Sequence, residues 1–134
     1  MAFREKSAWV MAAITLLTGI FYVRTSLSYP GSPVQETVLP YVLLIVILSV
    51  IAQVVLALRS PKEAAAPADE RERLVIQKSG YWAGIVLVVG IVLAGGAYIW
   101  APDGNMLFHR VVFALIGAQL VQYAAEIALL RRAF

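Results

Sequence analysis

Four long stretches of the chain carry no Lys, Arg, Asp or Glu, and this feature most restricts what the chain can fold into. They cover residues 7–23, 37–58, 79–102 and 111–125. A helix needs roughly 20 apolar residues to cross a hydrocarbon core of about 30 Å, and each stretch approaches or exceeds that length. Hydrophobic residues make up 61% of the chain and charged residues 14%, unlike an ordinary soluble domain. We therefore expect a lipid bilayer to surround most of the chain.

Four crossings use most of the 134 residues, so we expect one membrane domain covering residues 1–134. The predicted fold is an all-α polytopic membrane protein with four transmembrane helices in an antiparallel bundle. The predicted helices cover about residues 7–24, 33–58, 80–100 and 106–130, and the loop 59–79 carries a short interfacial helix from about residue 70. The short turn Ala-Pro-Asp-Gly-Asn makes the last two helices antiparallel neighbours.

The basic residues predict an orientation. If the amino terminus is cytoplasmic, all but Arg24 and Arg110 of the 11 Lys and Arg residues fall on the inner side. Lys and Arg near helix ends favour the cytoplasmic side of a membrane. Both termini and the loop 59–79 are therefore predicted to be cytoplasmic.

Several classes of protein are disfavoured by what the sequence lacks. The absence of cysteine removes disulfides, thiolate metal sites and thiol nucleophiles. No Ser-His-Asp triad, zinc motif or phosphate-binding loop is present. The net charge of +3 needs no nucleic acid to explain it, because no basic stripe is interleaved with aromatic residues. We expect no enzyme activity, no catalytic residues, no metal, no cofactor and no nucleic-acid partner.

A polar face interrupts the last predicted helix. Gln119, Gln122 and Glu126 follow one another at spacings of three and four, so they project from one side of a helix. Exposing a charged group to lipid costs from a few kcal/mol upward, so this face should look inward or toward a partner. Gln53 of the second helix lies at a comparable depth and completes the predicted intramembrane polar cluster.

Three interpretations of Glu126 remain open at this stage. The carboxylate can pair with a cation at the inner side, for which Arg59, Lys78 and Arg131 are the candidates. It can contact a partner or ligand. It can also take part in proton-linked transport, as acidic side chains within membranes often do.

Two helices carry small residues at helical spacing. Such faces let helices approach closely where lipid supplies no hydrophobic contrast. We expect these helix-packing positions to contact other membrane subunits or a second copy. The first helix has Ala8, Ala12, Thr15 and Gly19, and the third has Gly80 and Gly84 at GxxxG spacing.

An Asp-Glu-Arg run precedes the third span, formed by Asp69, Glu70, Arg71, Glu72 and Arg73. Asp69 followed by Glu72 three residues later is a capping-box pattern that predicts a helix start. A solvated helix start explains the run without a function. The alternative is a docking surface for a cytoplasmic protein or another subunit.

The one histidine, His109, stands beside Arg110 at the outer end of the last helix. We expect it to meet water or lipid headgroups at the interface. A less favoured interpretation makes it an axial haem ligand, with a second ligand from a partner subunit.

The segments FREKSAW and ADERERLVIQKSGYW, together with four short spans, resemble a group of small bacterial four-helix membrane proteins classed only as domains of unknown function. The resemblance covers nearly the whole chain and is most specific at residues 69–73. It implies the bacterial inner membrane and implies no activity. Small multidrug transporters are similar in size and helix count, but their essential glutamate lies in the first helix, where this chain has no acid between Ser7 and Val23.

The leading hypothesis is a non-enzymatic accessory subunit that binds other membrane proteins or itself. The alternative is a small oligomeric transporter or channel with a polar path around Glu126. The third hypothesis is a cofactor-carrying membrane subunit that uses His109.

Overall fold

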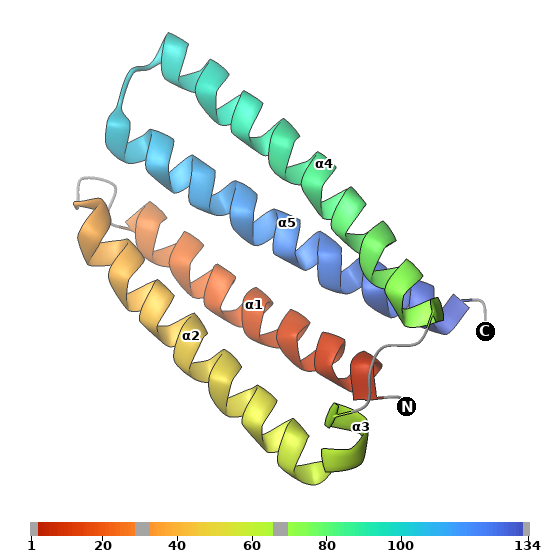
Figure 1. Ribbon diagram of the computed structural model, residues 1–134. Coiled ribbons are helices and arrows are strands. Elements are labelled where there is room, and N and C mark those ends of the chain that lie inside the picture. The colour runs from red at the N-terminus through yellow and green to blue at the C-terminus, as the bar shows by residue number, and fades with distance from the viewer. Residues whose placement is uncertain (1–2, 29–32, 66–69, 133–134) are drawn as a thin grey trace.

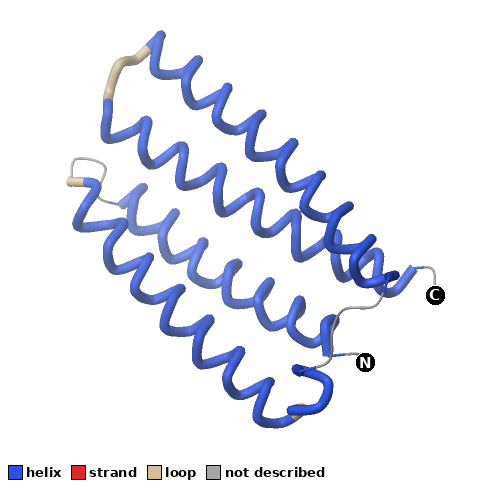
Figure 2. Tube along the Cα trace, in the orientation of Figure 1, coloured by secondary structure: helices blue, strands red, loops and turns tan. Residues whose placement is uncertain are grey.

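The computed structural model describes residues 3–28, 33–65 and 70–132, and helix dominates throughout (Figure 2). The helices are α1 (Phe3–Ser28), α2 (Val34–Arg59), α3 (Pro61–Ala65), α4 (Glu70–Trp100) and α5 (Gly104–Arg132). The all-α prediction is confirmed. Four of the helices, α1, α2, α4 and α5, are long and apolar enough to cross a membrane.

The helices extend beyond the predicted spans. Helix α4 runs without a break from Glu70 to Trp100, so the helix expected from about residue 70 continues directly into the third span. Part of the predicted loop 59–79 is therefore helical, including the short α3. The predicted spans followed the charge-free residues, but Glu, Arg and Lys are good helix formers and extend the helices past the apolar stretches.

The four long helices lie side by side in a row, in the order α2, α1, α5, α4 (Figure 1). Helix α1 packs against α2 and α5, and α5 packs against α4. Helices α2 and α4 form the two edges of the row and, within the described residues, have no extensive contact with each other. The structure is thus a row with two broad faces that is open over most of its length, while near the termini side chains of all four long helices come together.

Small residues allow the close helix contacts inside the row. A Cβ atom added at Gly19 would lie 2.9 Å from Cγ2 of Ile116, and one added at Gly90 would lie 2.6 Å from Cβ of Ala114. The buried residues of α1 are Ala8, Thr15, Thr18, Gly19, Tyr22 and Ser26. Most of the predicted small-residue stripe of the first helix is therefore used within the chain and is not available to a partner.

Candidate functional site

A cavity of about 160 Å³ lies near the chain termini, where all four long helices contribute side chains. Its polar lining includes Gln53 of α2 and Glu126 of α5, the two residues that the sequence placed at a comparable depth. The full lining is Phe3, Arg4, Ser7, Gln53, Glu72, Val75, Ile76, Glu126 and Leu130.

Two contacts between helices form walls of this cavity. The Nε atom of Arg4 donates to Oε2 of Glu72 at 3.1 Å, which joins α1 to α4. The side-chain amide of Gln53 donates to Oγ of Ser7 at 3.0 Å, which joins α2 to α1. A buried amide needs such a partner, and Ser7 supplies it in place of the glutamines of α5. The sequence did not identify Ser7 or Arg4 as site residues.

Glu126 is partly buried in this cavity and, within the described residues, forms no ion pair. Its predicted pairing with Arg59, Lys78 or Arg131 is wrong. Arg131 instead donates to Oε1 of Glu5 at 2.6 Å. Arg4, the one basic residue of the lining, is paired with Glu72, so an ionised Glu126 would make the lining residues net negative.

The other two members of the predicted polar cluster lie outside the cavity. Gln122 is partly buried and Gln119 is exposed, and neither lines the cavity. Gln119 stands seven residues before Glu126, roughly 10 Å along the helix axis. The polar face of α5 therefore begins inside the cavity and continues onto an open face of the row.

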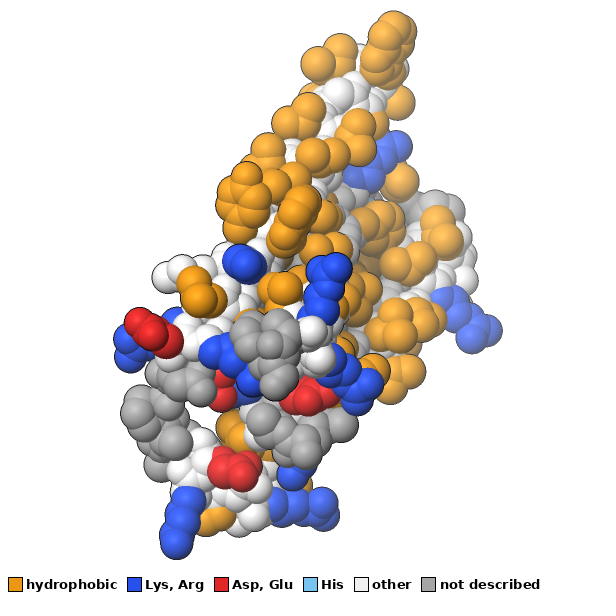
Figure 3. Space-filling model, turned by 90° about the vertical axis from the view of Figure 1, so that its right-hand side faces the viewer, with side chains coloured by type: hydrophobic (Ala, Val, Ile, Leu, Met, Phe, Trp, Pro, Cys, Tyr) orange, Lys and Arg blue, Asp and Glu red, His pale blue; other side chains and the backbone are white. Residues whose placement is uncertain are grey.

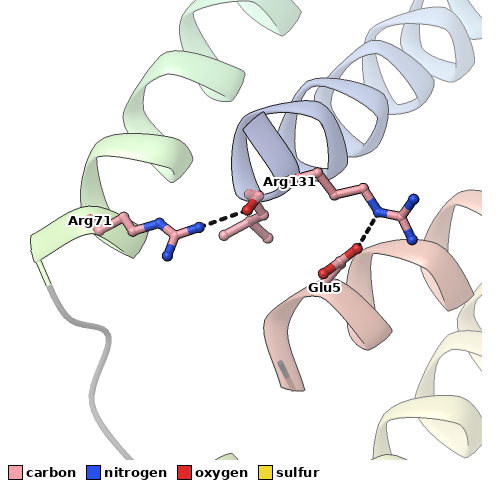
Figure 4. A network of polar contacts seen from close by, with 4 residues as sticks. Glu5, Arg71 and Arg131 are labelled. Carbon is pink, nitrogen blue, oxygen red and sulfur yellow. Dashed lines mark hydrogen bonds and ion pairs between the residues drawn. The ribbon is translucent and has the colours of Figure 1, made fainter. Parts of the chain in front are cut away.

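Part of the Asp-Glu-Arg run is engaged within the chain. Arg71 donates from Nη2 to the carbonyl oxygen of Leu130 at 2.6 Å (Figure 4). The last carbonyls of a helix lack intrahelical partners, and a cation there is favoured by the helix dipole. Glu72 pairs with Arg4. The predicted docking surface is thus reduced to the exposed Glu70 and Arg73, while Asp69 lies outside the described residues.

Charged side chains gather at the end of the molecule that holds the termini, while hydrophobic side chains cover the helices beyond it (Figure 3). At this end Arg131 contacts Glu5 and also lies over the ring of Trp9, 5.5 Å from its centroid. The hydrogen bond from Arg131 lowers the pKa of the Glu5 carboxyl below its ordinary value. These contacts tie the end of α5 to the start of α1.

His109 does not face water or headgroups, so that prediction is wrong. The side chain is buried, with 2% exposure, and its Nδ1 atom lies 2.5 Å from the hydroxyl of Tyr22. The ring also stacks on Phe113 at a centroid distance of 6.4 Å. A detectable signal existed in the sequence, because His109 precedes Val112 and Ile116 by three and seven residues, which places all three on one apolar helix face.

The cofactor hypothesis gains no support from this arrangement. One nitrogen of His109 is occupied by Tyr22, and the ring is enclosed by aromatic side chains. Among the described residues, no group of three or more His, Asp or Glu side chains is placed to hold a metal ion.

The predicted packing glycines of the third span do not pack closely against another helix among the described residues. A Cβ atom added at Gly80 or Gly84 would meet nothing within 4 Å, and both residues are exposed. They line a shallow hollow on the surface of α4 with Tyr81 and Val88. Ala12 of the first helix is partly buried beside α5.

No protein-family model, curated protein or solved structure matches this chain. The resemblance to small bacterial four-helix proteins of unknown function therefore stays a prediction.

Proposed function

We propose that this protein is a non-enzymatic subunit of the bacterial inner membrane that binds other membrane proteins, including further copies of itself. Its four long helices cross the bilayer in alternating directions, and both termini lie in the cytoplasm. The concentration of Lys and Arg at the end with the termini supports this orientation.

The observation that carries this proposal is the exposed amide of Gln119 on the open face of α5. In lipid, a polar side chain at this depth has no water to bond with, and a neighbouring helix is the natural source of a hydrogen-bond partner. A closed bundle would have hidden such a group in its own core. The open row leaves it to be covered from outside the chain.

The uncovered face of α4 gives further support. Gly80 and Gly84 leave a hollow that none of the described helices fills. Small residues at this spacing permit the close backbone approach that membrane helix contacts use.

Gentle extraction followed by native mass spectrometry tests the proposal. We expect the wild-type protein to appear with other subunits or as an oligomer, and Gln119→Leu to reduce that assembly while keeping the helical content. Gln77→Leu is the matched control, because Gln77 is also exposed but lies in the charged first part of α4. A bare monomer after the mildest extraction would contradict the proposal.

A second candidate function is transport coupled to protons or cations, and the cavity around Glu126 favours it. Within the described residues Glu126 forms no ion pair, and it lines a cavity to which all four long helices contribute. Proton relays in membranes use acidic side chains in such positions. Glu126→Gln should then abolish a proton-linked flux into proteoliposomes, while Gln119→Leu leaves it intact. Equal flux in wild type and Glu126→Gln would exclude this role for the carboxylate.

A further inference from the structure

A long apolar groove lies between α1 and α5 and shares no lining residue with the Glu126 cavity. It consists of two hollows of about 510 and 520 Å³ that are joined at Leu16 and Leu120. One hollow reaches Trp9, and the other reaches Arg24 and Ser28. The hollow that reaches Trp9 is lined in part by small residues, namely Ala12, Ala13, Ala124 and Ala128, and the other hollow is lined mainly by large aliphatic side chains.

The length of the groove indicates what can fill it. From Trp9 to Ser28 a helix rises about 28 Å, close to the thickness of a hydrocarbon core. An acyl chain from one leaflet would fill only about half of that length. A transmembrane helix fills all of it, and the small lining residues allow its backbone to come close.

Helix α2 has the surface that such a groove needs. Of its most apolar 18-residue stretch, 6% is buried, compared with 28% for α1. Its contact with α1 buries Thr37 and Tyr41, while large aliphatic side chains such as Leu43 and Ile47 remain exposed. Large side chains on α2 complement the alanines in the hollow that reaches Trp9.

Charge complementarity at the Arg24 end of the groove indicates which helix of a partner binds there. Arg24 lines the groove near the end of α1, and the exposed Glu36 lies in the first turn of α2, at the same end of the row. Within the described residues neither forms an ion pair. A second copy related by a two-fold axis parallel to the helices would place its Glu36 beside Arg24, and the reverse contact would form at the same time.

We infer that the groove between α1 and α5 binds α2 of a second copy, so that two chains form a symmetric dimer. This inference rests on the proposed role in assembly and names one partner. It leaves the Gln119 face of each chain free for other subunits.

Cysteine cross-linking in native membranes tests this contact directly, because the chain has no cysteine of its own. Two differently tagged copies are expressed together, one with Arg24→Cys and the other with Glu36→Cys. Oxidation should yield a linked dimer that carries both tags. Val92→Cys paired with Glu36→Cys is the control, since Val92 is exposed on α4, away from the groove, and should give no such product. Absence of the Arg24–Glu36 product would overturn the inference.

Charge exchange separates a specific contact from loss of folding. Arg24→Glu and Glu36→Arg should each lower the dimer association constant about tenfold, because two pairs per dimer become repulsive. The double exchange should restore the dimer, which a merely structural effect would not do. A double variant that stays dissociated would contradict the inference.

Native mass spectrometry distinguishes failure of this inference from failure of the proposed function. Other subunits bound to a single copy would overturn the dimer and support the role in assembly. A single copy carrying only lipid would overturn both.

Discussion

The two ends of the row are held together by different kinds of contact. At the charged end, ion pairs and hydrogen bonds from Arg4, Arg71 and Arg131 join α1, α4 and α5. At the aromatic end, Tyr22 packs between the ring of Tyr41 of α2, at a centroid distance of 5.0 Å, and the rings of His109 and Phe113 of α5. Exposed ion pairs contribute little and are screened by salt, whereas buried ring contacts depend on close packing. We therefore expect the contacts at the aromatic end to contribute more to stability than those at the charged end. The charged end, which holds the Glu126 cavity, should open more easily.

Tyr22→Ala should produce the largest effect. The side chain is fully buried among residues of α2 and α5, and removing a large buried ring costs about 3 kcal/mol or more. Reversible unfolding in mixed micelles measures the loss. Tyr81→Ala, which removes an exposed tyrosine of α4, is the control and should change stability little.

Tyr22→Phe isolates the hydrogen bond from the packing. The ring remains, but the hydroxyl that lies 2.5 Å from Nδ1 of His109 is lost. We expect a loss of about 1 kcal/mol in the free energy of unfolding. A loss as large as that of Tyr22→Ala would mean that the polar contact, and not ring packing, holds this end.

Glu72→Gln removes the ion pair at the rim of the cavity. Both partners are partly exposed, so we expect a change in unfolding free energy of at most about 1 kcal/mol. Amide hydrogen exchange should quicken in the first turns of α1 and α4 and stay unchanged near Tyr22. A global increase in exchange would show that the charged end is as important for stability as the aromatic one.

Acidification should give the smallest effect. The pKa of Glu5 is lowered in the folded protein by Arg131, so the stabilisation that this pair gives is present above the unfolded pKa of the carboxyl and disappears as the pH falls through the folded value. The fluorescence of Trp9, which Arg131 covers, reports the release. Trp82→Phe and Trp100→Phe leave Trp9 as the sole reporter, and adding Glu5→Gln to that background should remove the acid-dependent change.

The sequence predicted what depends on one helix at a time. Helical spacing placed Gln119, Gln122 and Glu126 on one face, and depth in the span matched Glu126 with Gln53. The structure brings Gln53 and Glu126 to one cavity, whereas Gln119 and Gln122 do not line it. The turn before α5 also behaves as its residues suggest, since Oδ1 of Asp103 accepts from the backbone amide of Asn105 at 3.1 Å.

What depends on the order of the helices in space was not predictable. Ser7 meets Gln53 because α1, and not α5, is the main neighbour of α2. Arg71 reaches Leu130 because α4 begins beside the end of α5. Spacing along one helix carries no information about which other helix lies opposite. These contacts could therefore be identified only once the packing of the helices was known.

The unbroken course of α4 has a consequence for the position of the cavity. Its 31 residues give a rod about 46 Å long, some 16 Å more than a hydrocarbon core of about 30 Å. In a bilayer, the part of α4 that begins at Glu70 would extend past the hydrocarbon core toward water. Gly90 meets Ala114 of α5 further along the same helix. The surplus of about 16 Å corresponds to about 11 residues, so the α4 wall of the cavity around Glu126, formed by Glu72, Val75 and Ile76, would lie at the membrane surface and not in the hydrocarbon core.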